Sequence, residues 1–153
     1  MEDSSWQPPS WMYRERRPPN DDAYFENMTR IIFQAGLSWK MISKKWPNFR
    51  KAFENFSIDK VAKFDDSDFA RLMVDKSIVR NRRKIEATIN NAKESQRIKR
   101  QFGSFRPYLD SLDKSQNYAL AIKELSKQFR RLGPSSARIF LYSIGEDVRH
   151  PEE

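Results

Sequence analysis

Two basic segments of this 153-residue chain have residue types that can bind phosphate groups. Leu132-Gly133-Pro134 forms a tight turn before a helix, whose free N–H groups and positive dipole end can hold an anion without regard to sequence. Arg131, Ser135 and Arg138 lie beside that turn. A second run, Arg80-Asn81-Arg82-Arg83-Lys84, offers further phosphate contacts, which position a protein on DNA. An ordinary helix–helix turn and a solvated charged face are the alternative interpretations.

The overall charge favours the same kind of partner. The 29 lysines and arginines exceed the 21 acidic residues, which gives a net charge of +8. Such a charge favours a polyanion, either nucleic acid or an anionic membrane surface. No apolar run approaches the roughly 18 residues of a membrane span, and the N-terminus has no secretory signal pattern. We therefore expect an intracellular protein that does not act on a membrane.

A third segment, Phe33-Gln34-Ala35-Gly36-Leu37-Ser38-Trp39, places a glutamine and a tryptophan on either side of a glycine break. Aromatic residues at helical spacing commonly belong to a core, and that is one interpretation. A buried amide, however, requires hydrogen-bond partners, which is less typical of a core position. The other interpretation is a binding pocket, to which Trp6 and Tyr13 of the N-terminal segment could contribute.

The composition excludes many chemistries. The chain has no cysteine and one histidine, so disulfides, thiol nucleophiles, thiolate metal sites and two-histidine metal sites are excluded. A structural zinc ion needs four ligands that this chain does not supply. No glycine-rich nucleotide loop or serine–histidine–aspartate order can be assembled. We expect neither a metal nor another cofactor.

The apolar spacing predicts an all-α fold of about eight to ten short helices, with no alternating run long enough for a strand. Residues 1–19, rich in proline and aromatic residues, are predicted to form an arm packed on the body, and residues 20–153 a single helical domain. The first helix is expected to have its cap at Asn20 or Asp21 and to end at Gly36, and the second to run from Ser38 and stop before Pro47. A third helix should begin at Pro47, a fourth should be capped by Ser57, and a fifth by Asp66 or Ser67. A long basic helix toward Gly103, a helix from Tyr118 to Leu132 and a last helix from Pro134 should follow.

The ordered motifs in the first two thirds of the chain resemble the DNA-3-methyladenine glycosylase I family. They are Phe33–Trp39, Phe49-Arg50-Lys51-Ala52-Phe53, Lys60-Val61-Ala62, Arg71-Leu72, Asp75, Ile78–Ile85 and Asn91-Ala92. The resemblance covers Phe25 to Ala92 strongly and Tyr118 to His150 more weakly. It places the Leu132-Gly133-Pro134 turn where the family has its helix–hairpin–helix DNA-binding element.

The resemblance implies a compact helix–hairpin–helix DNA glycosylase that flips a damaged base out of the duplex and hydrolyses its N-glycosidic bond. The partner is then double-stranded DNA carrying an alkylated base such as 3-methyladenine, and we expect a cytoplasmic, nucleoid-associated monomer. The family pattern assigns base stacking to Trp39, a pocket position to Tyr13 and a second aromatic to Trp6, with Gln34 and Ile31 in the same pocket. The predicted DNA contacts are Arg80, Arg82, Lys84, Arg131, Gly133, Ser135 and Arg138.

The chain departs from the family pattern at two sites. Ile31 replaces a pocket glutamate, so that recognition is expected to shift toward stacking and base charge. The family's zinc site, which ties the two termini with two cysteines and two histidines, has Arg14 in place of its first histidine and retains only His150. We expect the arm to be held by packing of Trp6 and Trp11 and by pairs of Arg14 or Arg16 with Glu152 and Glu153.

Two functions remain open at this stage. The first is an active base-excision glycosylase, in which Asp147 or Glu146 after the last helix assists the attacking water. The second is a non-catalytic DNA-binding relative that kept the scaffold and lost the pocket. Trp39, Gln34 and Tyr13 favour the first, whereas Ile31 favours the second.

Overall fold

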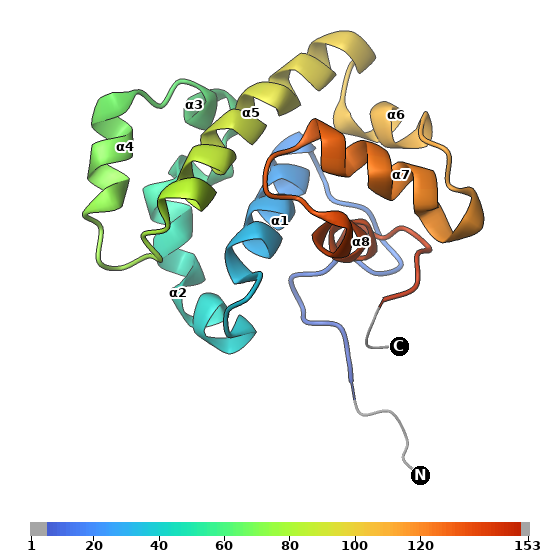
Figure 1. Cartoon of the computed structure of the whole chain (residues 1–153), viewed down its shortest axis with the longest axis horizontal. Coiled ribbons are helices and arrows are strands. Elements are labelled where there is room, and N and C mark those ends of the chain that lie inside the picture. The colour runs from blue at the N-terminus through green and yellow to red at the C-terminus, as the bar shows by residue number, and fades with distance from the viewer. Residues whose placement is uncertain (1–5, 151–153) are drawn as a thin grey trace.

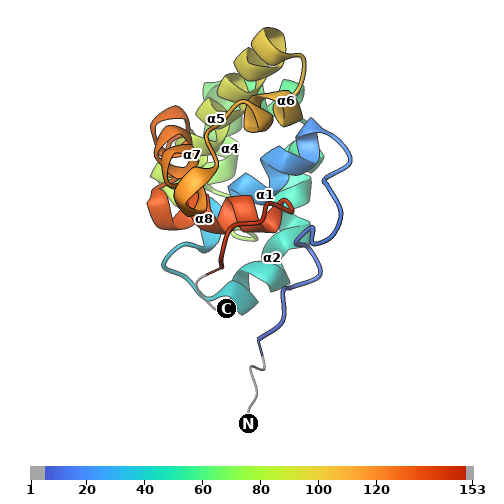
Figure 2. The same cartoon turned by 90° about the vertical axis from the view of Figure 1, so that its right-hand side faces the viewer.

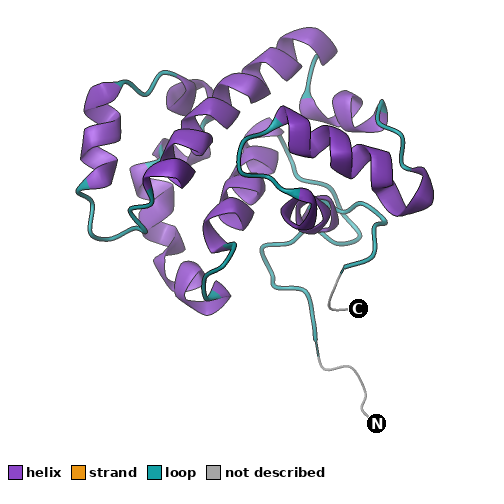
Figure 3. Ribbon diagram, in the orientation of Figure 1, coloured by secondary structure: helices purple, strands orange, loops and turns teal. Residues whose placement is uncertain are grey.

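The computed structural model describes residues 6–150 and is all-helical in that range, as predicted (Figure 3). The helices are α1 Asp21–Gln34, α2 Trp39–Ala52, α3 Ile58–Ala62, α4 Asp66–Met73, α5 Arg82–Phe102, α6 Phe105–Asp110, α7 Ser115–Gln128 and α8 Pro134–Ser143, with the 3-10 turn η1 Glu54–Phe56 after α2. None of these helices combines the length and apolarity that crossing a membrane would require.

Helices α1 and α5 lie in the middle of the molecule, with α2–α4 on one side and α6–α8 on the other (Figure 1). Both helices contribute residues to two hydrophobic clusters. The first cluster joins them to α2, η1, α3 and α4, and its centre is aromatic: Phe25, Phe33, Trp46, Phe49, Phe53 and Phe56. The second cluster joins them to α6, α7 and α8. Because α1 carries buried residues on opposite faces, such as Phe33 for the first cluster and Ile31 for the second, it has almost no solvent-exposed face. The segment that follows α1 is thereby held between both halves of the molecule.

Most helix boundaries follow the predicted capping residues. Asn20, Ser38 and Ser57 accept hydrogen bonds from the first turns of α1, α2 and α3, as expected of N-caps. Helix α5 begins after Asn81 and ends at Gly103, which has a φ of +90°. Pro134 begins α8. The cap of α4 is Asp65 rather than Asp66 or Ser67, because Asp65 and Asp68 form a reciprocal capping box.

The predicted break at Pro47 is wrong, since α2 continues through this residue to Ala52. Proline in a helix interior removes one backbone hydrogen bond and costs about 3 kcal/mol. In this helix Ile42, Trp46 and Phe49 continue a single buried face across the proline, and Trp46 stacks on Phe49 with ring centroids 4.9 Å apart. Burial of that face offsets the local cost, so tertiary packing overrides the sequence signal.

The N-terminal arm packs on the segment that follows α8 (Figures 1 and 2). Met12 is buried, and the Tyr13 backbone N–H donates to the Ser143 carbonyl at 2.7 Å. Gly145 has a φ of +93°, and a Cβ atom there would lie 2.7 Å from the Arg16 carbonyl oxygen. Glycine is therefore required at 145 both by its backbone conformation and by the close approach of the arm.

Candidate active site and nucleic-acid interface

The predicted pocket segment forms the junction between α1 and α2. Gln34 is the last residue of α1 and is 2% exposed, and the chain reverses through Gly36, whose φ is +76°. Trp39 is the first residue of α2 and packs, partly buried, against the cluster that contains Ile31. The turn thus brings Trp39 back toward the α1 face that carries Ile31.

The arm contributes a different aromatic residue from those predicted. Trp11 lies next to Trp39, with ring centroids 6.5 Å apart and planes inclined by 57°. Trp6 instead stacks on His150, at 4.4 Å between ring centroids. The Tyr13 ring faces the Arg16 guanidinium at 4.4 Å. The sequence offered only a weak signal for Trp11, namely a tryptophan close to Tyr13 in a proline-rich arm.

Arg14 ties the arm to the end of α8. Its Nη1 atom donates to the carbonyl oxygens of Tyr142 at 2.6 Å and Glu146 at 3.0 Å, and its guanidinium lies 3.8 Å from the centroid of the Tyr142 ring. A guanidinium engaged in this way is a donor and not a metal ligand. Residues 6–150 hold no group of three or more side chains of metal-binding type. The donor set therefore does not fit the family's zinc site. The predicted partners Glu152 and Glu153 lie outside the described residues.

Lys84 supports the pocket turn from α5. Its side chain is 5% exposed, and its ammonium group donates at 2.9 Å to the carbonyl oxygens of Phe33 and Ala35. These carbonyls belong to the C-terminal end of α1, where helix carbonyls have no partner within the helix and a cation is favoured by the dipole. Burial, together with the charge of Arg131, lowers the pKa of Lys84. This ammonium group is directed into the protein rather than toward solvent.

Asn91 supports the turn between α7 and α8, which we call the hairpin and which comprises residues 129–133. It lies on the same face of α5 as Lys84, two turns further on. Its Oδ1 accepts from the Arg130 N–H at 2.9 Å, and its Nδ2 donates to the Arg130 carbonyl at 3.0 Å. Asn91 is 1% exposed, so both amide groups are satisfied by this one residue. One helix therefore fixes both the pocket turn and the hairpin.

The two predicted phosphate-binding segments meet in space. A cavity of about 460 Å³ is lined by Arg83 from the start of α5 and by Arg130 and Arg131 from the hairpin. The side chains of Arg80, Arg82, Arg131 and Ser135 are exposed, and that of Arg138 is half-buried. Gly133 has a φ of −67°, and a Cβ atom there would meet nothing within 4 Å. Neither backbone strain nor packing therefore requires glycine at 133. The space beside its Cα atom is empty, so a phosphate group can approach the hairpin backbone closely.

The two candidate acids have different surroundings. Glu146 is 7% exposed, and its carboxylate contacts Arg106, Lys114 at 3.0 Å and the Tyr118 hydroxyl at 3.0 Å. Burial raises the pKa of Glu146, but hydrogen bonds and charge from Arg106 and Lys114 outweigh this and hold its pKa below the ordinary value. Asp147 is exposed and lines a cavity of about 570 Å³ with Arg14.

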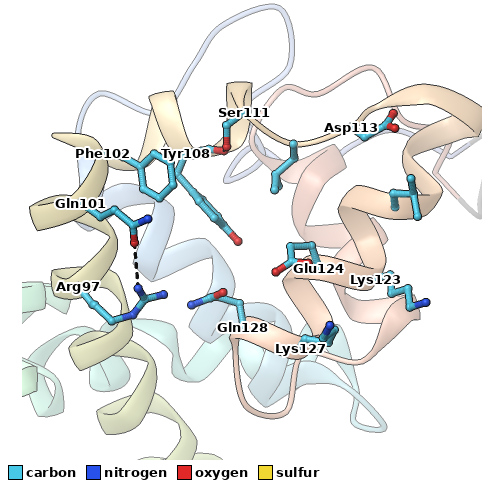
Figure 4. A pocket seen from close by; sticks show the side chains of 12 residues that line it. Arg97, Gln101, Phe102, Tyr108, Ser111, Asp113, Lys123, Glu124, Lys127 and Gln128 are labelled. Carbon is cyan, nitrogen blue, oxygen red and sulfur yellow. Dashed lines mark hydrogen bonds between the residues drawn. The ribbon is translucent and has the colours of Figure 1, made fainter.

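A larger cavity, of about 650 Å³, lies between α5, α6 and α7 (Figure 4). Tyr108 points its hydroxyl into the space near Glu124 and Gln128, and this buried hydroxyl has no hydrogen-bond partner. Burial, followed by the charges of Glu124 and Glu94, raises the pKa of Tyr108. None of the predicted substrate or DNA residues lines this cavity, so it is separate from the pocket turn.

An all-helical scaffold that joins an aromatic turn to a basic hairpin is the architecture of a helix–hairpin–helix DNA glycosylase. The family model for methyladenine glycosylase matches residues 9–139, so the chain belongs to the methyladenine glycosylase family. Over 60 residues it is 47% identical to DNA-3-methyladenine glycosylase 1 of Escherichia coli (strain K12), a match that covers 39% of this chain and 32% of that protein. Over 69 residues it is 39% identical to DNA-3-methyladenine glycosylase of Haemophilus influenzae, a match that covers 45% of this chain and 37% of that protein.

In these two matches the chain spans only about a third of the length of each curated relative. Solved structures of related proteins align over more of the chain. A complex of 3-methyladenine with a tyrosine-to-phenylalanine variant of 3-methyladenine DNA glycosylase I aligns with a TM-score of 0.75 and 29% identity, over 89% of this chain and 83% of that one. The Staphylococcus aureus enzyme aligns with a TM-score of 0.73 and 28% identity, over 90% and 85%.

Proposed function

We propose that this protein is a base-excision DNA glycosylase that hydrolyses the N-glycosidic bond of an alkylated base, such as 3-methyladenine, after flipping it from the duplex. The observation that carries the proposal is the double attachment of α5, through Lys84 to the pocket turn and through Asn91 to the hairpin. A hairpin bound to phosphates then holds Trp39 at a fixed distance from the DNA backbone. Family membership supports the same function.

In this proposal Trp39 stacks on the flipped base, and Gln34 and Ile31 line the pocket beside it. Flipping costs a few kcal/mol, which stacking in the pocket offsets. Tyr13 and Trp6 hold the arm against the end of α8 and the segment after it, through the Ser143 carbonyl and the His150 ring. The phosphate contacts come from Arg80, Arg82, Arg131, Gly133, Ser135 and Arg138, whereas the buried ammonium of Lys84 positions the turn. The protein acts on duplex DNA as a monomer.

Hydrolysis of an alkylated nucleotide requires little acid catalysis, because a positively charged methylated purine is already a good leaving group. Water attacks the sugar carbon as the N-glycosidic bond breaks, and the bonding electrons leave with the base. Asp147, exposed near the end of α8, is the proposed group that accepts the proton of this water. Glu146 already has two cations and a hydroxyl around its carboxylate, which supports a positioning role for it.

The second candidate function is a non-catalytic DNA-binding relative. The observation in its favour is Ile31, which is 1% exposed and packs in the core cluster where a substrate-contacting acid would stand. The other acids of α1 do not replace it. Asp21 accepts from the Phe105 N–H, Asp22 accepts from the Ile58 N–H, and Glu26 accepts from Trp46 and Arg50.

Base release from alkylated duplex DNA separates the two functions. We expect the wild type to release methylated bases and Trp39→Ala to reduce kcat/KM by roughly five- to 140-fold, since base stacking on an aromatic side chain contributes about 1–3 kcal/mol. The measurement is chromatography of the free bases. Leu120→Ala, an exposed position on α7, is the control and should retain wild-type activity. A wild type that binds the duplex but releases no base would establish the non-catalytic alternative.

DNA affinity should fall steeply with salt. Each phosphate contact contributes about −0.9 to the slope of log K against log [salt]. We expect Arg80→Ala combined with Arg82→Ala to make this slope less negative by about two, without loss of thermal stability, because both side chains are exposed. The control is Lys60→Ala on α3 with Lys63→Ala directly after it, which removes the same charge elsewhere. Equal slopes for the two double variants would contradict the assigned interface.

A further inference from the structure

Arg30 is a buried arginine that has no role in the proposed function. It lies on α1 with 7% of its surface exposed, and its guanidinium carbon is 4.5 Å from the centroid of the Trp11 ring and 5.2 Å from that of Trp46. Its Nη2 atom donates to the Ser43 hydroxyl at 2.6 Å, whereas its Nε atom is buried without a hydrogen-bond partner. Burial lowers the pKa of Arg30 to about 10, so the side chain still carries its charge at neutral pH.

Gln34 repeats this feature one helical turn further along α1. It is 2% exposed, and its Nε2 atom is also buried without a partner. Residues four apart lie on the same helix face, so the two unpartnered donors lie on one face of α1. Buried polar groups are almost always hydrogen-bonded, and leaving one unpaired costs about 1–3 kcal/mol. Two unpaired buried donors on one face of α1 indicate that this face can bind a ligand that supplies acceptors.

The aromatic residues identify the kind of ligand. Trp11 covers the Arg30 guanidinium and lies next to Trp39, the residue that stacks on the flipped base in the proposed function. A planar base that displaces the Trp11 ring exchanges one aromatic contact of Arg30 for another. The ligand of these donors is therefore a base with acceptor atoms on its edge.

No carboxylate forms an ion pair with Arg30, although the charge of Glu26 partly offsets the effect of burial on its pKa. Across residues 6–150, no acidic oxygen lies within the 4.0 Å ion-pair distance of Arg30. Glu26, one turn away, gives the same oxygen to Trp46 at 2.8 Å and to Arg50 at 2.7 Å. Ile31, which replaces the family's pocket acid, offers no acceptor, and the carboxylate of Glu26 is engaged by other donors, so the site presents hydrogen-bond donors and a positive charge. Such a site is unfavourable for a cationic base and favourable for a neutral one with carbonyl oxygens.

We propose that Arg30 and Gln34 select a neutral base bearing a carbonyl acceptor, of the 6-oxopurine class, in preference to a cationic alkylated base. This inference rests on the proposed function, because it concerns the base that the same pocket receives. The reaction is unchanged in its balance: the water oxygen bonds to the sugar carbon, the N-glycosidic bond breaks, and the base leaves with the electron pair and gains a proton. A neutral oxopurine acquires negative charge as it leaves, and the Arg30 guanidinium stabilises that charge.

The test compares binding of hypoxanthine and adenine to the full chain, followed by tryptophan fluorescence. The two bases share their ring system and differ in having a carbonyl or an amine at position 6. We expect hypoxanthine to bind at least tenfold more tightly, since a hydrogen bond from a charged donor contributes about that factor or more. Arg30→Met should abolish this preference. Arg50→Met, which removes an exposed arginine that pairs with Glu26, should retain it.

A second variant protects the test against misfolding. Arg30→Lys keeps the charge and loses the planar donor set, and it should retain the melting temperature while losing most of the preference. Equal affinity of the wild type for the two bases, or failure to bind either, would overturn the inference.

Duplexes containing deoxyinosine or methylated bases separate the two proposals. Faster release of hypoxanthine than of 3-methyladenine supports both. Release of 3-methyladenine alone overturns the inference and leaves the glycosylase function in place. Release of neither, with the hypoxanthine preference intact, overturns the glycosylase function and supports the donor site.

Discussion

Replacing Glu146 by alanine is expected to lower the free energy of unfolding by about 3–5 kcal/mol, because removing one member of a buried ion pair leaves the other charge uncompensated. Glu146 is 7% exposed, and Arg106, whose side chain is 17% exposed, is its principal partner. Lys114 and Tyr118 complete the group and connect the α6–α7 region to the segment after α8. For a domain of this size the loss corresponds to a melting temperature lower by about 10 °C, measured by circular dichroism.

The contribution of Glu146 should also depend on pH. Its pKa in the folded protein lies below the value of about 4.3 that glutamate has in an unfolded chain. The stabilisation is therefore fully present above that unfolded value and is lost as pH falls through the lower folded value. We expect the difference in stability between wild type and Glu146→Ala to be constant from pH 7 to about 5 and to shrink below about pH 4.

Asp110→Ala is the matched control for Glu146→Ala. Asp110 contacts the same two cations, at 3.0 Å from Arg106 and 3.5 Å from Lys114, but its side chain is 53% exposed. Exposed pairs contribute about 0–1 kcal/mol, so this variant should remain close to wild type. If the two variants had the same small effect on stability, and only Glu146→Ala abolished base release, Glu146 would act in catalysis as the sequence suggested.

The sequence predicted the local features of the fold that depend on neighbouring residues. Asn20, Ser38, Ser57 and Gly103 mark helix ends because capping is an interaction within one turn. The break at Pro47 was wrong because the continuity of α2 depends on aromatic packing against residues far away in the chain. No local pattern contains that information.

The candidate site was predictable only in part for the same reason. The motif around Trp39 and the hairpin could be found as residue patterns, and the structure brings the basic run of α5 next to that hairpin. The partners of a buried polar group could not be found in this way. In the sequence Arg30 cannot be distinguished from an exposed arginine on a helix. Only the fold shows that its guanidinium is enclosed by Trp11 and Trp46. Asn91 was part of a recognised motif, but its two bonds to Arg130 require the α7–α8 turn to be in place.

The sequence predicted Lys84 as a phosphate contact within a run of cations, whereas the structure buries its ammonium group against backbone carbonyls. Replacing it by methionine, which preserves most of the aliphatic stem, is expected to lower the free energy of unfolding by about 2–4 kcal/mol, since hydrogen bonds from a charged donor contribute about 1.5–3 kcal/mol each and are not additive. The carbonyl groups of Phe33 and Ala35 lose their donor, and the turn that carries Trp39 loses its support. Urea denaturation measures the first effect.

The salt dependence of DNA binding decides between the two roles of Lys84. Because its ammonium group is bonded within the protein, Lys84→Met should leave the slope of log K against log [salt] unchanged, even where affinity falls. Lys99→Met is the control, since Lys99 is an exposed lysine on the same helix and its replacement should leave stability within about 0.5 kcal/mol of wild type. A slope less negative by about one, with unchanged stability, would show that Lys84 contacts a phosphate, as the charge run suggested. The position of this one ammonium group therefore determines whether the basic run of residues 80–84 contributes to DNA affinity through all of its cations or through its exposed arginines alone.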